Sequence, residues 1–344
     1  MNQEKGKKTE SSSAESDRQS IQYHVYGIGN PLIDIVSQAK DEDLSQLDIN
    51  KGIMHLIDLP RRRKILQHLA GRGVVHSCGG SAPNTMIASH GVTSRIGMGD
   101  GSTGSSIILV TPDYERSMNT YLGMCREYER SDVDEELVRQ SRFLYFPGYM
   151  WDTEKQKDAV LHAVSVAEEA GCTVVFDAAD PFAVERNREV FLELIENHAS
   201  VVFANRRETE LLFGTSDPED GVSRLAEICD VAAVKIGKDG SLVRGRELSH
   251  TAAEAAGKPD AGSRETTKTI RIPAHPAEVS DTTGAAAMYA AGFLYGLATG
   301  MGLEASAKVA GYMAARIIER TGAQFDAEQM QAIRDAVEAG DWEI

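Results

Sequence analysis

The chain has 344 residues, of which 42% are hydrophobic, and a formal net charge of −16. It is long enough to bury a full core as one large or two small domains. The acidic balance argues against nucleic acid or an anionic membrane as a partner, because basic faces bind such surfaces. The four cysteines lie far apart and predict neither a zinc site nor a disulfide framework: Cys78, Cys125, Cys172 and Cys229. We therefore expect a reduced, cytoplasmic protein.

Residues 1–22 carry charges and serines without an apolar run, so we expect a disordered tail and neither a signal peptide nor an anchor. A β-rich run at 23–36 follows and is interrupted by Gly29-Asn30-Pro31. A dinucleotide-binding motif fails here, because Pro31 stands where a helix should open and the third glycine is absent. Asn30 and Asp34 are either a turn residue and a surface carboxylate or ligands of a substrate.

A short strand at 52–57 and a helix at 59–71 precede the paired glycines Gly79 and Gly80. Paired glycines let the backbone approach a ligand closely, and Asn84 offers a donor and an acceptor on the next helix. Residues 107–123 read as two strands joined by a Pro-Asp turn, which predicts a hairpin.

Strands and helices alternate from residue 137 onward, with strands at 143–146, 173–177 and 201–205 and helices at 155–170 and 188–197. This pattern predicts a parallel sheet with helices on both faces and ligands at the carboxyl ends of its strands. Asn205 and Glu208 stand at one such end. They are either a helix cap with a first-turn glutamate or a carboxylate that acts on Mg²⁺ through water.

A second hairpin is expected at 231–243, with Lys235, Gly237 and Gly240 around its turn, and a surface loop at 251–269. At residues 281–287 the sequence changes from polar to apolar, and the apolar run that follows is too short to span a membrane. We expect a turn that opens a buried helix, with Asp281 or Thr282 near its N-cap. Unpaired N–H groups at such a helix start can hold a phosphate. A helix at 303–321 follows. An acidic amphipathic helix or tail is expected at 326–344, of which 331–344 is the C-terminal helix or tail beyond the domain.

In this order the motifs resemble the ribokinase-like (PfkB) family of sugar and nucleoside kinases, whose signature is D-T-x-G-A-G-D. The run G-N-P-L-I-D is similar to that of the adenosine kinase branch. The resemblance covers about residues 23–325. It implies an α/β fold with a doubly wound, mostly parallel sheet flanked by helices, in one domain at 23–330. It also implies a small β-sheet lid built from strands at about 35–57 and 104–123.

The activity implied is ATP- and Mg²⁺-dependent phosphoryl transfer to a hydroxyl of a nucleoside or sugar, with a possible homodimer through the lid. The resemblance gives a substrate-binding role to Asn30, Asp34, Gly79, Gly80 and Asn84. It places the anion hole at Gly284, Ala285 and Ala286. It gives nucleotide contacts to Asn205, Lys235, Gly237, Gly240, Thr283 and Gly311, and a magnesium role through water to Glu208. Lys235 replaces the family's threonine and could contact phosphate as a point charge.

Besides Lys235, the chain departs from the family at two further places. Ala286 and Ala287 stand where the signature has glycine and the aspartate base, and loss of a base typically costs about 10² to 10⁴ in rate. Near residues 91–99 there is no room for a crossover between parallel strands, so one βα unit of roughly thirty residues is expected to be missing. The sequence thus predicts an impaired kinase or a pseudokinase that binds or scaffolds, or else a stable domain without a ligand.

Overall fold

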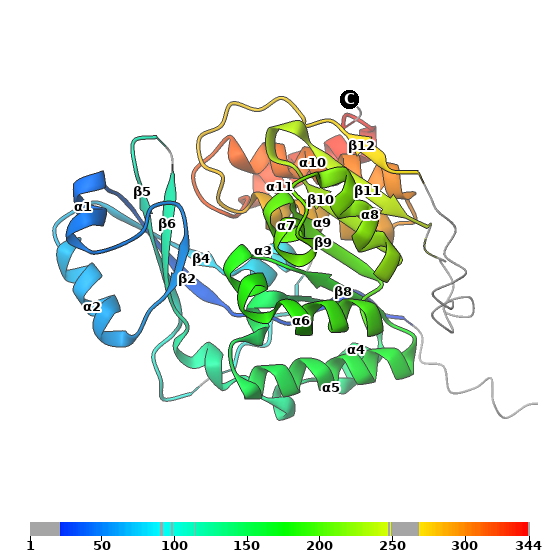
Figure 1. Cartoon of the computed structure of the whole chain (residues 1–344), viewed down its shortest axis with the longest axis horizontal. Helices are drawn as coiled ribbons and strands as arrows, with labels where there is room; N and C mark the ends of the chain where they lie inside the picture. The colour runs from blue at the N-terminus through cyan, green and yellow to red at the C-terminus, as the bar shows by residue number, and fades with distance from the viewer. Residues whose placement is uncertain are drawn as a thin grey trace, which may run out of the picture.

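The computed structural model describes residues 21–89, 92–97, 99–113, 115–246, 248 and 268–342. Two sheets lie side by side in it, a large one surrounded by helices and a small one at the end of the molecule (Figure 1). The expected N-terminal tail and the expected loop at 251–269 lie almost wholly outside the described residues.

The large sheet has seven strands in the order β1-β7-β8-β9-β10-β11-β12. Their bounds are β1 Tyr23–Gly27, β7 Ser141–Pro147, β8 Thr173–Asp177, β9 Val201–Asn205, β10 Val231–Lys235, β11 Ser241–Gly245 and β12 Ile270–Ile272. The five strands from β1 to β10 run parallel, and β11 and β12 are antiparallel to their neighbours. The mostly parallel sheet predicted from the alternating pattern is confirmed.

Helices cover both faces of this sheet. One face packs on α4 Glu135–Arg139, α5 Glu154–Ala170, α6 Pro181–Asn197, α7 Arg206–Phe213 and α8 Pro218–Ile228. The other face packs on α3 Ser81–Ser89, α9 Ala285–Ala298 and α10 Leu303–Ile318. Successive side chains of a strand point to opposite faces, so Phe176 joins the first core and Val175 the second. This explains why the strands read as unbroken apolar runs.

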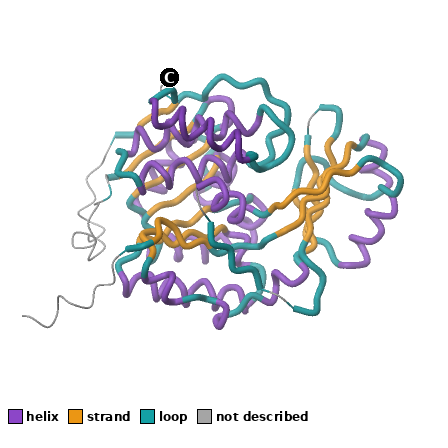
Figure 2. Tube along the Cα trace, turned by 180° about the vertical axis from the view of Figure 1, so that it is seen from behind, coloured by secondary structure: helices purple, strands orange, loops and turns teal. Residues whose placement is uncertain are grey.

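The small sheet has five strands in the order β3-β6-β5-β2-β4. Their bounds are β2 Leu32–Gln38, β3 Met54–Leu56, β4 Val74–Gly79, β5 Ser105–Val110 and β6 Arg116–Tyr121. The predicted hairpin is the antiparallel pair of β5 and β6. The sheet also includes β4, which the sequence pattern did not indicate. Its outer face is covered by α1 Asp41–Gln46 and α2 Leu59–His68, as Figure 2 shows from behind.

Helix α6 begins seven residues earlier than predicted. Its N-cap is Asp180, whose carboxylate accepts a hydrogen bond from the backbone N–H of Phe182 at 2.8 Å, and Pro181 occupies the first helical position. The backbone of Asn187 leaves helical geometry inside the helix. The sequence pattern therefore showed only the part after this kink.

One expected boundary in the C-terminal region was wrong, because helix α10 ends at Ile318, three residues before the predicted end. Helix α11, Ala327–Ala339, is capped by Asp326, where the C-terminal helix or tail was expected to begin. Met330, Ile333 and Val337 of α11 pack in one apolar cluster with side chains of α9 and α10. The C-terminal helix is thus part of the α/β body.

Between α3 and β5 the described residues, 92–97 and 99–104, form neither helix nor strand. The large sheet accordingly ends at β1, which pairs with β7 on its inner side. Four short 3₁₀ turns complete the fold, at Gly123–Glu127, Arg130–Asp132, Gly148–Trp151 and Gly237–Asp239.

Replacing Phe176 by alanine should lower the free energy of unfolding by about 3–5 kcal/mol, since a large buried ring is lost. Phe176 is fully buried, and its ring centroid lies 5.6 Å from that of Phe146 and 5.1 Å from that of Phe191. Urea unfolding followed by circular dichroism measures the change. Leu161→Ala is the control, because Leu161 is 44% exposed on α5 and its loss should cost within about 0.5 kcal/mol.

Candidate active site

The glycine-containing turn before α9 differs from its expected geometry at one point. The N-cap of α9 is Gly284, at a φ of 86°, so the N-cap expected at Asp281 or Thr282 is wrong. The carboxylate of Asp281 instead accepts hydrogen bonds from the backbone N–H groups of Thr283 at 2.8 Å and Gly322 at 2.9 Å. Asp281 thus joins this turn to the segment that follows α10.

The three alanines after Gly284 form the first turn of α9. Ala285 is half-buried and Ala286 is exposed. Ala287 is only 5% exposed, and its methyl group belongs to an apolar cluster that includes Ala88 of α3. N–H groups in the first turn of a helix lack acceptors within that helix, which suits an anion. A methyl group at 287, however, cannot accept a proton.

The structure brings together four of the residues predicted to bind a substrate. A Cβ atom added to Gly79 would lie 2.2 Å from the Asp34 carboxyl group. One added to Gly80 would lie 2.1 Å from the backbone oxygen of Asn30, and Gly80 also has a φ of 101°. Residues 79 and 80 must therefore lack a Cβ atom, because the end of β4 passes close to Asp34 and to the turn at Asn30.

Two glutamines that no sequence motif marked hold the two predicted asparagines. Gln156 of α5 donates from Nε2 to Oδ1 of Asn30 at 2.9 Å. Gln324 donates from Nε2 to Oδ1 of Asn84 at 2.9 Å. Asn30 and Asn84 are both buried. Their amide oxygens are thus fixed by protein contacts in this structure.

Arg116, which the sequence interpretation missed, links the small sheet to the turn before α9. Its Nη1 donates to Oγ1 of Thr283 at 2.8 Å, and its Nε lies 4.0 Å from Oδ1 of Asp281. Burial lowers the pKa of Arg116, while Asp281 and Asp34 oppose that shift. Burial likewise raises the pKa of Asp34 to about 6, although Arg116 holds it down. A lone arginine at the start of a strand gave no signal in the sequence.

Asn205 and Glu208 form a reciprocal capping box at the start of α7. The backbone N–H of Glu208 donates to Oδ1 of Asn205 at 2.9 Å, and that of Asn205 donates to Oε2 of Glu208 at 2.8 Å. Glu208 is 1% exposed, and burial raises its pKa to about 8. The local structural interpretation of this motif is therefore observed, and a role toward magnesium stays a prediction.

Lys235 ends β10 and extends toward the neighbouring strands. Its Nζ lies 3.6 Å from Oδ1 of Asp177, the last residue of β8. Tyr145 of β7 donates from its hydroxyl group to Oδ2 of Asp177 at 3.2 Å. Neither Asp177 nor Tyr145 was predicted as a site residue. Within the described ranges, no group of three or more His, Cys, Asp or Glu side chains is placed to hold a metal ion.

The remaining glycines predicted near the nucleotide lie on two elements. Gly237 and Gly240 are in the turn between β10 and β11, and Gly240 packs closely on the backbone of Ile272. Gly311 lies on α10, where an added Cβ would be 3.5 Å from the ring of His275.

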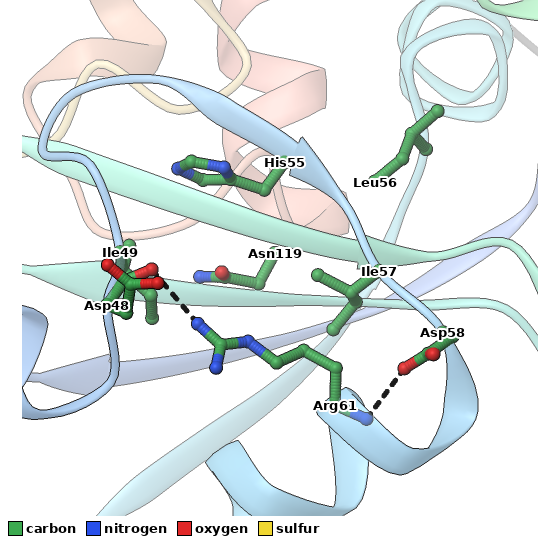
Figure 3. A pocket seen from close by; sticks show the side chains of 8 residues that line it. All are labelled: Asp48, Ile49, His55, Leu56, Ile57, Asp58, Arg61 and Asn119. Atoms are coloured by element: carbon green, nitrogen blue, oxygen red, sulfur yellow. Dashed lines mark hydrogen bonds between the residues drawn. The ribbon is translucent and has the colours of Figure 1, made fainter.

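A pocket of about 460 Å³ lies elsewhere, on the α2 side of the small sheet (Figure 3). Its lining consists of Asp48, Ile49, His55, Leu56, Ile57, Asp58, Arg61 and Asn119. Arg61 donates from Nη2 to the backbone oxygen of Asp48 at 3.0 Å across it. None of the predicted site residues lines this pocket, so we place the candidate site around Arg116 and Lys235.

Gly80→Ala should cost about 1–3 kcal/mol more unfolding free energy than Gly171→Ala, because a methyl at 80 must displace the backbone of Asn30. Both glycines have positive φ, but an added Cβ at Gly171 meets nothing within 4 Å. The comparison therefore removes the common cost of backbone strain. Equal costs in denaturant unfolding would show that the close approach at Gly80 is unimportant.

Asp34→Asn should change how stability depends on pH. The folded-state pKa of Asp34, about 6, lies above its ordinary value of 3.8. The stability that protonated Asp34 contributes is therefore fully present below about pH 3.8 and is lost as pH rises through about 6. This loss amounts to about 3 kcal/mol. The variant should lack it, in urea unfolding measured from pH 4 to 7. Asp158→Asn, on an exposed position of α5, should keep the wild-type slope.

The chain was compared with known proteins, and a family model described as pfkB family carbohydrate kinase matches residues 77–330. An adenosine kinase structure from Sinorhizobium meliloti is 34% identical, has a TM-score of 0.79, and covers 91% of this chain and 99% of its own. A probable sugar kinase from Rhizobium etli is 29% identical, with a TM-score of 0.80 and coverage of 93% and 99%.

An uncharacterized sugar kinase from Archaeoglobus fulgidus is 25% identical over 65% of this chain and 80% of its own length. No helix among the described residues is long and apolar enough to cross a membrane. The family match spans well over half of the chain and includes Arg116, Lys235 and the turn at Asp281. The chain therefore belongs to the pfkB family of carbohydrate kinases.

Proposed function

We propose that this chain binds a nucleoside, such as adenosine, together with ATP, and that it transfers the phosphoryl group only slowly. The observation that carries the proposal is the contact of Arg116 with Thr283. It sets a cation from the small sheet against the turn that leads into α9, and the N–H groups in the first turn of a helix suit a phosphate. Similarity to an adenosine kinase at 34% identity supports a nucleoside as the substrate.

The inner face of the small sheet offers polar groups to such a substrate. Asp34, Ser106 and Thr120 are register neighbours on β2, β5 and β6. The hydroxyl groups of Ser106 and Thr120 lie 3.1 Å apart, and all three side chains are buried. A carboxylate beside two hydroxyl groups suits the hydroxyls of a ribose.

ATP, when bound, would supply the γ-phosphoryl group. Arg116 and the first-turn N–H groups of α9 would stabilise negative charge that develops during transfer. The acceptor hydroxyl must lose its proton as its oxygen bonds to phosphorus, and position 287 provides only a methyl group. We therefore expect a rate about 10² to 10⁴ below that of a relative with a carboxylate there.

A second candidate function is binding without turnover, as in a pseudokinase. The observation that favours it is the burial of Ala287 in the apolar cluster with Ala88, where its methyl group cannot accept a proton. A retained pocket would then serve a scaffold or sensor role.

We also propose that Asn205, Gly237, Gly240 and Gly311 contact the nucleotide. The protein is further proposed to be cytoplasmic and to pair as two copies through the small sheet. A role of Glu208 toward magnesium also stays a proposal, and in this structure Glu208 engages Asn205 with both carboxylate oxygens.

The Ala286→Gly, Ala287→Asp double variant should form ADP from ATP in the presence of adenosine about 10² to 10⁴ times faster than the natural chain. Restoring the carboxylate gives the hydroxyl proton an acceptor. A coupled assay of ADP release measures the rate, and circular dichroism checks that both proteins fold.

Ala286→Gly alone is the matched control, because it restores room at the turn without a base. It should leave the rate near that of the natural chain. If the folded double variant is as inactive as the natural chain, the kinase proposal fails and binding without turnover becomes the better account.

A further inference from the structure

The side chain of Lys235 spans the carboxyl ends of three parallel strands. Lys235 is the last residue of β10 and pairs in register with Asn205 at the end of β9. Its ammonium group nevertheless lies 3.6 Å from the carboxylate of Asp177, at the end of β8. The Lys235 side chain is 15% exposed and that of Asp177 is 1% exposed. The ammonium group is therefore placed deep at this edge of the sheet.

The groups around Lys235 are acidic and buried. Asp177 accepts hydrogen bonds from the Tyr145 hydroxyl at 3.2 Å and from the backbone N–H of Ala179 at 3.1 Å. Glu208 is 1% exposed, and both of its carboxylate oxygens accept hydrogen bonds from Asn205. The close ion pair at this edge is that of Lys235 with Asp177.

Lys235 also lies on the face of the sheet from which α9 begins. Side chains alternate along a strand, so Lys235 shares a face with Val231 and Ala233, which pack in the same core as Tyr289. Tyr289, one turn inside α9, donates its hydroxyl hydrogen to Oγ of Ser241 at 2.9 Å. Ser241 is the register partner of Lys235. Lys235 therefore lies on the face of the sheet that α9 covers, at the carboxyl ends of the parallel strands.

A magnesium ion does not fit the residues at this position. Mg²⁺ prefers ionised carboxylates, water and phosphate in octahedral geometry. Here Asp177 already faces an ammonium group, which would repel a divalent cation, and Glu208 is buried and bonded through both oxygens to Asn205. The ammonium group of Lys235 already supplies a positive charge at this position.

We propose that Lys235, and not a magnesium ion, neutralises the nucleotide phosphates at this edge of the sheet, so that the chain binds ATP without a divalent metal. The inference rests on the proposed function, since it requires that ATP binds in this site. A lysine acts as a point charge with three donors and needs no bidentate geometry, which suits the variable positions of a polyphosphate chain.

Isothermal titration of ATP into the full chain tests this without any substitution. With EDTA and with excess Mg²⁺, the dissociation constants should agree within about threefold. Binding at least about tenfold weaker in EDTA would overturn the inference while leaving ATP binding, and so the proposed function, intact. No binding under either condition would instead overturn the proposed function and this inference with it.

Lys235→Thr supplies the second arm. Its affinity for ATP should fall at least about tenfold in EDTA and recover in excess Mg²⁺, because the hydroxyl side chain no longer carries charge and Asp177 is freed. Lys64→Thr, which removes an exposed lysine of α2, is the matched control and should bind as the natural chain does. If folded Lys235→Thr binds ATP in EDTA as well as the natural chain, Lys235 has no such role.

Discussion

A hydrogen bond from Arg116 to Thr283 joins the small sheet to the turn before α9. A guanidinium group on the small sheet satisfies a hydroxyl group at the turn before α9, and its charge keeps the buried Asp34 from an even higher pKa. Without that cation, Asp34 and Asp281 would be two buried carboxylates with the same charge and no counterion between them. The arrangement of the candidate site thus depends on one long side chain that crosses between two layers.

The repeating part of the fold could be predicted from the sequence. Strands β8 and β9 have the predicted bounds, because each is an unbroken apolar run closed by a polar residue and preceded by a clear helix stop. The start of α6 could not be predicted, since the kink at Asn187 breaks its periodicity. The glycine pair at 79 and 80 could be predicted as a close approach, but its partners are 45 and 50 residues distant along the chain, at Asp34 and Asn30.

Within the candidate site, motifs predicted the residues that stand in recognisable local patterns, and the others are bound by long-range contacts. Gln156 and Gln324 act on Asn30 and Asn84 from helices and loops far away in sequence. The contact partners of Arg116 and Asp177 are likewise distant in sequence and are known only from the folded structure. The N-cap of α9 was misplaced because Asp281 has the right residue type for a cap, but its carboxylate oxygens accept hydrogen bonds from the N–H groups of Thr283 and Gly322. Composition gives the donors and acceptors, but not which of them meet.

The double attachment of Asp281 has a consequence for thermodynamic coupling. One carboxylate bonds to the turn that contacts Arg116 and also to Gly322, just beyond the end of α10. Any displacement of Gly322 is therefore transmitted through this carboxylate to the turn that Arg116 contacts. If ligands bind at both ends, linkage requires each to change the affinity of the other by the same factor.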